Sequence, residues 1–390
     1  MAAGVPTDFA GRRGPLFRLA LRTGILTVLT LGIYRFWMKT RLRRYYWSSV
    51  RPGGHPLEYV GEPMEKLLGF LIAVVALAFY IGIVNLILMY LSFALLHGNV
   101  TAYALSFVGV IPIWFYAMYR ARRYELARTR WRGLRFGVDP GAWGYAGRAL
   151  IHWAVTILSL GLLWPRMTFA LEKYKIDRTW LGDQRLHQGG RWQMLYRPFV
   201  PVLLCAAGIG LGLLGIGTES GTLPLLLFPA GLGLLPALVH YNVQSARRLA
   251  NHRTAGPLGL RAAPRTARVI GIYAGGYALI LAALGALIFG ALIAMGTVFG
   301  VAAATLPNLE NLPEVPAWIP ALFGVGAYFS VFLLWGVLGH VFVTLPLWRH
   351  YAETLSVIGT ENLSALRQRP RDEFREAEGF AEALDLGAAI

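Results

Sequence analysis

Five polar side chains lie inside long apolar stretches of the sequence, where such groups are costly and are therefore candidates for chemistry. Two are histidines, whose ring nitrogens can form hydrogen bonds. The others are amides and a hydroxyl, which donate and accept hydrogen bonds. Such groups can line a cavity that binds or moves a small solute or lipid, or they can simply link neighbouring helices. The candidate intramembrane polar site consists of Asn85, His240, Asn242, His340 and Thr344.

The pattern Arg-x-Arg-Arg-Tyr occurs twice, at 41–45 and at 120–124. Guanidinium groups form bidentate contacts with phosphate, so these clusters can bind anionic lipid headgroups. The alternative is that they only anchor the cytoplasmic side of the membrane, beside aromatic residues at the interface. Anionic phospholipid is the expected partner, and the candidate headgroup contacts are Arg41, Arg43, Arg44, Arg120, Arg122 and Arg123.

The sequence lacks the signatures of common catalytic sites: it has no His-Glu-x-x-His, no Gly-x-x-x-x-Gly-Lys-Ser/Thr and no Gly-x-Ser-x-Gly. Its one cysteine, Cys205, cannot form an intramolecular disulfide or a cysteine-based metal site. A Gly-x-Gly-x-x-Gly string at 210–215 has no strand before it, so close helix packing explains it better than a dinucleotide site. We therefore expect no enzyme, cofactor or metal.

The composition indicates that the polar residues named above lie within a membrane. Hydrophobic residues make up 56% of the 390 residues, and charged residues only 15%, against about 25% in soluble domains. The mean hydropathy is +0.51. Stretches free of Lys, Arg, Asp and Glu are longer than the roughly 18 residues that indicate a bilayer span. They cover 67–119, 198–218, 220–246 and 269–309. The chain is therefore expected to be a polytopic membrane protein.

The positive charge is concentrated between these stretches. The chain has 37 Lys and Arg against 20 Asp and Glu, a formal net charge of +17, and all the basic residues fall in 12–66, 120–197, 247–268 and 349–375. Basic loops stay on the cytoplasmic side of a membrane, so both termini are expected to be cytoplasmic. Because the charge follows the membrane boundaries and does not form one compact basic domain, we expect no nucleic-acid partner.

Six apolar segments are long enough to cross a hydrocarbon core of about 30 Å. Their three intervening turns contain no Lys or Arg, so the segments pair as three hairpins with the turns outside. The predicted spans are Leu67–Leu96, Ala102–Tyr119, Phe199–Gly217, Leu223–Asn242, Val269–Ala303 and Trp318–Leu347.

Two further apolar segments, Gly24–Tyr34 and Ala149–Trp164, are short and have basic residues on both sides. Crossing the bilayer alone would place a basic block outside, so we interpret them as interfacial or re-entrant helices. An alternative with eight spans has a less regular charge distribution. Alternating residues after Pro52-Gly53-Gly54 indicate a short cytoplasmic β-hairpin whose first strand would be Tyr46–Arg51. The predicted fold class is thus an all-α polytopic membrane protein with three transmembrane helical hairpins and minor cytoplasmic β-hairpins.

An internal repeat is predicted from matching segments. Thr30-Leu31-Gly32-Ile33-Tyr34 precedes a basic helix, as Ser159-Leu160-Gly161-Leu162-Leu163 precedes another at the same spacing. We expect a first unit at 1–135, a second at 136–256, a third reduced to a hairpin at 257–359, and a charged cytoplasmic tail at 360–390. Within that tail, 371–385 has the pattern of a short amphipathic helix.

The stretch Leu26–Trp47 (LTVLTLGIYRFWMKTRLRRYYW), followed by Pro56–Phe70 (PLEYVGEPMEKLLGF), resembles the YjgN family of bacterial inner-membrane proteins. The specific part is TLGIY…W…R…RRYYW, and the rest, through about Val357, is similar in layout more than in motif. The second unit departs from the pattern, since Glu172-Lys173 replaces the paired arginines. The resemblance implies a multi-span inner-membrane protein whose family has no established activity, so it brings no catalytic residues.

Two functions are consistent with these patterns. The first is a non-enzymatic inner-membrane protein that binds or moves a small solute or lipid through its intramembrane polar residues. The alternative is a membrane scaffold that transports nothing and binds anionic lipid through its cytoplasmic basic helices.

Overall fold

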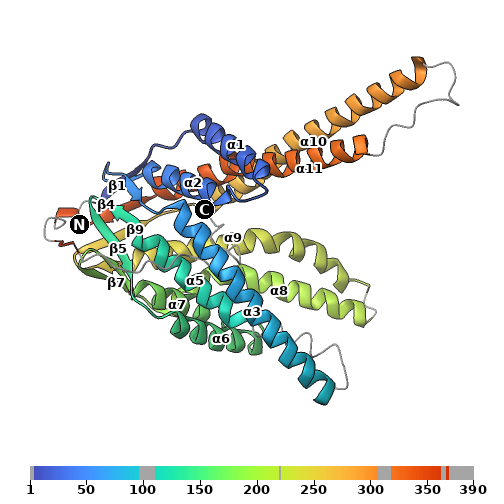
Figure 1. The fold of residues 1–390 in the computed structure, drawn as a ribbon. Coiled ribbons are helices and arrows are strands. Elements are labelled where there is room, and N and C mark those ends of the chain that lie inside the picture. Colours follow the sequence, from blue (N-terminus) through green and yellow to red (C-terminus); the bar gives the residue numbers. More distant parts are fainter. Residues whose placement is uncertain (1–3, 96–109, 219–220, 306–317, 362–365, 369–390) are drawn as a thin grey trace. The chain divides into compact units, whose positions relative to one another are not determined.

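The computed structural model describes residues 4–95, 110–218, 221–305, 318–361 and 366–368, drawn as ribbons in Figure 1. Five helical stretches in this part are long and apolar enough to cross a membrane, which agrees with the expected polytopic helical membrane protein. They are Pro63–Leu91, Trp192–Gly217, Leu223–Asn251, Thr266–Ile293 and Gly324–Glu353. Of the predicted span Ala102–Tyr119, residues 102–109 lie outside the described residues and the rest lies in a helix.

A ten-stranded antiparallel sheet makes the predicted all-α class too narrow. The sequence predicted minor cytoplasmic β-hairpins, but the strands on either side of Gly53-Gly54 are the two edge strands of one sheet and do not form a hydrogen-bonded hairpin with each other. The strands are β1 (Val5–Phe9), β2 (Val50–Pro52), β3 (Leu57–Tyr59), β4 (Thr129–Trp131), β5 (Leu134–Val138), β6 (Thr179–Leu181), β7 (Gln184–Gln188), β8 (Arg253–Ala255), β9 (Leu258–Ala262) and β10 (Leu355–Ile358). Their order is β2-β1-β10-β9-β8-β7-β6-β5-β4-β3.

Short turns and helical connections alternate along this sheet. The turns after β4, β6 and β8 join hydrogen-bonded neighbours, and each contains a glycine with positive φ, namely Gly133 (80°), Gly182 (58°) and Gly256 (56°). Glycine adopts this conformation without steric cost. Because neighbouring strands are antiparallel, the turns lie at one end of the sheet and the helical connections leave from the other.

Five helical connections link strands that are neighbours in the sheet. In each connection, the first helix begins a few residues after one strand, and the last helix ends just before the next strand. They are α1 (Arg13–Leu29) with α2 (Arg35–Ser49); α3 (Pro63–Leu95) with α5 (Val110–Ala127); α6 (Ala142–Leu158) with α7 (Trp164–Ile176); η1 (Trp192–Leu195) and α8 (Tyr196–Gly217) with η2 (Leu223–Leu226) and α9 (Leu227–Asn251); and α10 (Thr266–Thr305) with α11 (Trp318–Gly339), the π-helix η4 (His340–Thr344) and α12 (Leu345–Glu353).

The N- and C-terminal strands are hydrogen-bonded to each other. Val5 of β1 is opposite Val357 of β10, and Phe9 of β1 is opposite Val50 of β2. The chain thus returns to this sheet after every helical connection, so β1 and β10 lie on the same side of any membrane that the helices cross. The predicted strand Tyr46–Arg51 is displaced, because α2 continues to Ser49 and β2 begins at Val50.

Each of the two short apolar segments contains a reversal between two helices, where one short helix was expected. Gly24–Tyr34 holds the end of α1 and the turn into α2, and Ala149–Trp164 holds the second half of α6 and the turn into α7. These four helices have 17, 15, 17 and 13 residues, or about 20–25 Å at 1.5 Å per residue. They are shorter than the roughly 30 Å of a bilayer core.

The chain divides into two compact units that are each discontinuous in sequence. The first comprises residues 1–10, 43–269 and 349–390 and contains the whole sheet; the second comprises 11–42 and 270–348. This division differs from the consecutive repeat units proposed from the sequence, although the order helix–helix–strand–strand does recur along the chain. Of the predicted tail 360–390, the amphipathic helix at 371–385 lies outside the described residues.

Apolar side chains form separate cores in these units. In the first unit, one cluster lies within the sheet around Trp131, Leu181 and Leu258, and another packs α7, α8 and α9 together around Phe199. Close backbone approach contributes to the second, since a Cβ on Gly212 would lie 2.7 Å from Leu227. This supports helix packing as the role of Gly212. In the second unit, Ile280, Leu284 and Val343 form the core.

Candidate functional site

The intramembrane polar residues do not form one group. His240 is half-buried and Asn242 exposed on α9 of the first unit, whereas His340 and Thr344 are half-buried in the second unit. Asn85 belongs to α3, and its side chain lies outside the described part of the chain. The structure therefore brings together His340 and Thr344, at the two ends of one short helical segment.

That segment, His340–Thr344, is a π-helix. Single π-turns inside longer helices are often found at functional sites, because they change the backbone hydrogen-bonding pattern locally. Here the turn packs closely against α10: a Cβ on Gly276 would lie 2.7 Å from the carbonyl oxygen of Phe342. The sequence singled out both ends of this turn as polar residues but gave no sign of the π-helix.

The first arginine cluster is split between solvent and core. Arg43 is fully buried and forms an ion pair with Glu125 of α5. Arg41 and Arg44 are exposed, and the Nη2 of Arg44 donates a hydrogen bond to the carbonyl oxygen of Gly61 at 2.9 Å. The Arg41 guanidinium lies 5.7 Å from the centre of the Tyr34 ring, a contact that leaves its N–H groups able to bind an external anion, whereas Arg43 is paired inside the protein.

The second arginine cluster contacts protein groups to a larger extent. The Nη1 of Arg120 donates to the Tyr116 hydroxyl at 2.8 Å, and the guanidinium lies 5.6 Å from the centre of that ring. Arg122 and Arg123 are half-buried, and the charge of Arg122 acts on Glu172. This cluster is less accessible to lipid headgroups than Arg41.

Glu172 of α7 is the centre of a buried ion cluster. Its carboxylate lies 2.7 Å from the Nη2 of Arg253 on β8 and 2.6 Å from the Nζ of Lys175. Burial by itself raises the pKa of Glu172, but the charges of Lys175, Arg253 and Arg122 more than offset this and hold the pKa at about 2. Glu172 is therefore ionised at neutral pH and joins α7 to the sheet.

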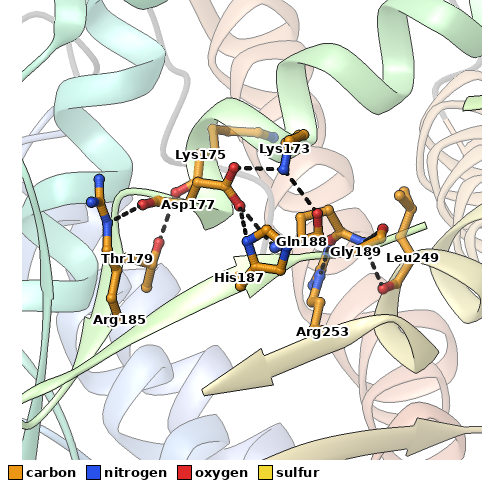
Figure 2. A network of polar contacts seen from close by, with 10 residues as sticks. All are labelled: Lys173, Lys175, Asp177, Thr179, Arg185, His187, Gln188, Gly189, Leu249 and Arg253. Carbon is orange, nitrogen blue, oxygen red and sulfur yellow. Dashed lines mark hydrogen bonds and ion pairs between the residues drawn. The ribbon is translucent and has the colours of Figure 1, made fainter. Parts of the chain in front are cut away.

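Figure 2 shows the polar network that continues from this cluster. Asp177, just after α7, accepts a hydrogen bond from the backbone N–H of Gln188 at 2.8 Å. It also forms an ion pair with Lys173 at 2.8 Å. The Gln188 side chain accepts from the Nε of Arg253 at 3.0 Å and donates to the carbonyl oxygen of Leu249 at 3.0 Å. The network fixes the ends of α7 and α9 to β7 and β8, which is a structural role.

The reversal between α1 and α2 has a defined backbone geometry. Leu31 and Gly32 have positive φ angles of 49° and 94°. The N–H of Gly32 donates to the carbonyl oxygen of Thr27 at 2.8 Å, and the N–H of Tyr34 donates to the Thr30 hydroxyl at 3.0 Å. Positive φ is uncommon for a leucine.

The reversal between α6 and α7 has the same geometry. Leu160 and Gly161 have φ angles of 51° and 84°. The N–H of Gly161 donates to the carbonyl oxygen of Thr156 at 2.8 Å, and the N–H of Leu163 donates to the Ser159 hydroxyl at 3.2 Å. The segments matched in the sequence thus form the same turn twice.

Both reversals present apolar side chains outward. Leu31 is 90% exposed and Leu160 is 93% exposed, in a left-handed conformation that has an energetic cost for leucine. Further exposed apolar residues surround each of them, and we call these two surfaces the apolar tips. The first tip consists of Leu29, Leu31 and Ile33, and the second of Ile157, Leu158, Leu160 and Leu162.

The sequence is similar to known bacterial proteins. A model of the family described as "Bacterial protein of unknown function (DUF898)" matches residues 5–383. The chain belongs to this family. The inner membrane protein YjgN of Salmonella typhimurium is similar to it, with 29% identity over 140 residues, which cover 35% of this chain and 33% of the relative. The chain thus matches about a third of the length of this curated relative. No solved structure matches.

Membership in this family confirms the resemblance seen in the sequence. The name of the relative, together with the five long apolar helices, supports a multi-pass location in the inner membrane. Among the residues that the structure describes, no group of three or more His, Cys, Asp or Glu side chains is placed to hold a metal ion.

Proposed function

We propose that the protein is a lipid-binding scaffold of the bacterial inner membrane, with its sheet and both termini in the cytoplasm. The observation that carries this proposal is the pair of apolar tips, which end helical hairpins too short to cross a bilayer. Exposed leucines are stable in hydrocarbon and costly in water. Each tip therefore dips into a leaflet of the membrane.

In this arrangement, Arg41 is placed to contact a lipid headgroup. It lies six residues after Arg35, the first residue of α2, or about 9 Å along the helix from the first apolar tip. Interfacial helices bury about 5–10 Å into the boundary between headgroups and acyl chains. With Leu31 in the hydrocarbon, the exposed guanidinium of Arg41 lies at the level of the phosphates, where it binds an anionic headgroup.

The test is the amount of phosphatidylglycerol that the purified full-length protein retains, measured by native mass spectrometry during a titration. Arg41→Gln should weaken binding about fivefold, because one basic residue near an anionic surface contributes about 1 kcal/mol. Arg261→Gln is the matched control, since Arg261 is also exposed but lies on β9. Equal retention by Arg41→Gln and the wild type would contradict the headgroup role.

A second function, the passage of a small solute or a proton, is favoured by the π-helix that ends in His340 and Thr344. Its test is proton uptake by vesicles that contain the reconstituted protein and an entrapped pH-sensitive dye. Uptake by the wild type that is lost in His340→Ala would support a route through the second unit. The absence of uptake by the wild type, while it still binds phosphatidylglycerol, would leave the scaffold as the better account.

A further inference from the structure

The ten-stranded sheet curves back on itself. Its two edge strands, β2 and β3, are separated in the sequence by residues 53–56 alone and lie beside each other. Pro52 and Leu57 are five residues apart in the sequence and cannot lie more than about 18 Å from each other, so the sheet must bring its edges together. A sheet of about this size that closes in this way encloses space for side chains or one small ligand.

The interior of the sheet contains a cavity of about 220 Å³, and its lining is apolar. Strands alternate their side chains between the two faces, and residues two apart on one strand, such as Leu258 and Leu260, point to this cavity together. The full lining is Val50, Pro52, Leu57, Trp131, Phe136, Leu181, Leu186, Arg253, Thr254, Ala255, Leu258, Leu260, Leu355 and Val357.

The two polar residues of this lining do not offer a binding group to the interior. The guanidinium of Arg253 is bound to Glu172 at 2.7 Å and to the side chain of Gln188 at 3.0 Å. Only the aliphatic carbons of Arg253 are therefore left to line the cavity. Thr254 is exposed to solvent. A polar ligand would therefore lose its hydrogen bonds to water without replacement, at a cost of several kcal/mol.

A segment after β10 covers the turn end of the sheet. Leu366 is 9% exposed and packs with Trp131, Leu181 and Val357. The backbone N–H of Asp183 donates to the carbonyl oxygen of Arg367 at 2.9 Å. The side chain of Gln368 donates to the Gly133 carbonyl at 2.8 Å and accepts from the Arg135 N–H at 3.0 Å. We call residues 366–368 the cover segment.

We infer that this cavity binds one hydrocarbon chain, the acyl chain of a fatty acid or of a phospholipid. An apolar cavity of about 150 Å³ already stays dry and accepts a small apolar molecule, and this one is larger. The long apolar helices and the inner-membrane name of the relative support a location in a bilayer, where acyl chains are the apolar molecules present in the highest amount. The inference concerns the sheet and is independent of the headgroup contact at Arg41.

The experiment is photochemical labelling of the full-length protein in vesicles, followed by peptide mapping. One sample receives a fatty acid with a diazirine in its chain, and the other a phosphatidylglycerol with the same group in one acyl chain. Adducts on peptides that contain Trp131, Leu181 or Leu258 are expected, and the sample that gives them identifies the source of the chain. Labelling confined to α8–α11 in both samples would overturn the inference.

A cavity-filling variant supplies the second readout. Leu181→Trp should lower labelling of the sheet about tenfold, because a filled interior resists additional volume, while labelling of α8 and α9 stays constant. Leu213→Trp is the matched control, since Leu213 is 58% exposed on α8. If Leu181→Trp does not fold, an excess of unlabelled fatty acid must reduce sheet labelling of the wild type. Unchanged labelling in the competition would also overturn the inference.

Discussion

Leu31 and Leu160 occupy the same position in two separate reversals, with φ angles of 49° and 51° and exposures of 90% and 93%. A left-handed leucine costs about 1–2 kcal/mol, and glycine would remove that cost. No contact within the part of the folded chain that the structure describes offsets the cost of an exposed leucine in water at these two positions. In the proposed arrangement, contact with the hydrocarbon of a membrane offsets this cost.

The buried ion cluster gives a prediction about stability. Glu172→Gln removes the negative partner of Arg253, whose burial lowers its own pKa. Breaking such a buried pair costs about 3–5 kcal/mol, so the thermal midpoint of the variant in detergent should fall clearly. Asp8→Asn, at an exposed position of β1, should leave the midpoint unchanged. Equal midpoints for Glu172→Gln and Asp8→Asn would refute the stabilising role.

The pH dependence of stability follows from the same carboxylate. Its pKa in the folded protein, about 2, lies below the ordinary value of 4.5. The contribution of Glu172 is therefore complete above about pH 4.5 and is lost as the pH falls towards 2. Denaturant unfolding between pH 2 and 7 should show a difference between the wild type and Glu172→Gln that shrinks at the acid end. A constant difference would contradict this assignment.

The sequence predicted the long helices well because a bilayer span depends on local composition. It predicted the sheet poorly, because sheet pairing joins distant residues such as Val5 and Val357. The β-hairpin after Pro52-Gly53-Gly54 shows the limit: its turn was recognised, but its strands β2 and β3 pair with β1 and β4 and not with each other in the order of the sheet. A local sequence pattern does not show that the two edge strands of the sheet come to lie beside each other.

The glycine beside the π-helix gives a third prediction, with a control at the adjacent residue. A Cβ on Gly276 would lie 2.7 Å from both the Phe342 carbonyl oxygen and the Val343 side chain, whereas a Cβ on Gly275 meets nothing within 4 Å. Gly276→Ala should therefore lower the free energy of unfolding by about 1–3 kcal/mol. Gly275→Ala should be neutral or stabilising, by up to about 1 kcal/mol, because alanine favours a helix. Thermal midpoints in detergent compare them, and a stable Gly276→Ala would count against this packing.

The cover segment gives a fourth prediction. Gly182 and Gly133 both have positive φ, 58° and 80°, so alanine is strained at either position. Only at Gly182 would the new Cβ collide with the cover segment, 2.5 Å from the Arg367 carbonyl oxygen. Gly182→Ala should therefore accelerate trypsin cleavage after Arg367, and Gly133→Ala should do so much less. Equal rates for the two variants would show that the collision does not displace the segment.

The candidate sites were predictable to different degrees. Charge patterning identified Arg41 and Arg43 alike, although one is exposed and the other fully buried, because a sequence does not give the side of a helix that a neighbour covers. The pairing of Glu172 with Arg253 was missed, since 81 residues separate them. The matched Leu-Gly reversals were seen in the sequence, but their conformation was not, because leucine rarely has positive φ.

The most direct measurement is the depth of the two apolar tips. In a Cys205→Ala background, a cysteine at position 31, 160 or 53 is labelled with an environment-sensitive fluorophore in the reconstituted protein, and lipids with bromine on their acyl chains serve as quenchers. Labels at 31 and 160 should be quenched strongly, and the label at Gly53, in the turn between β2 and β3, should not be. Quenching at 31 and 160 no greater than at 53 would contradict membrane insertion and, with it, the proposed scaffold.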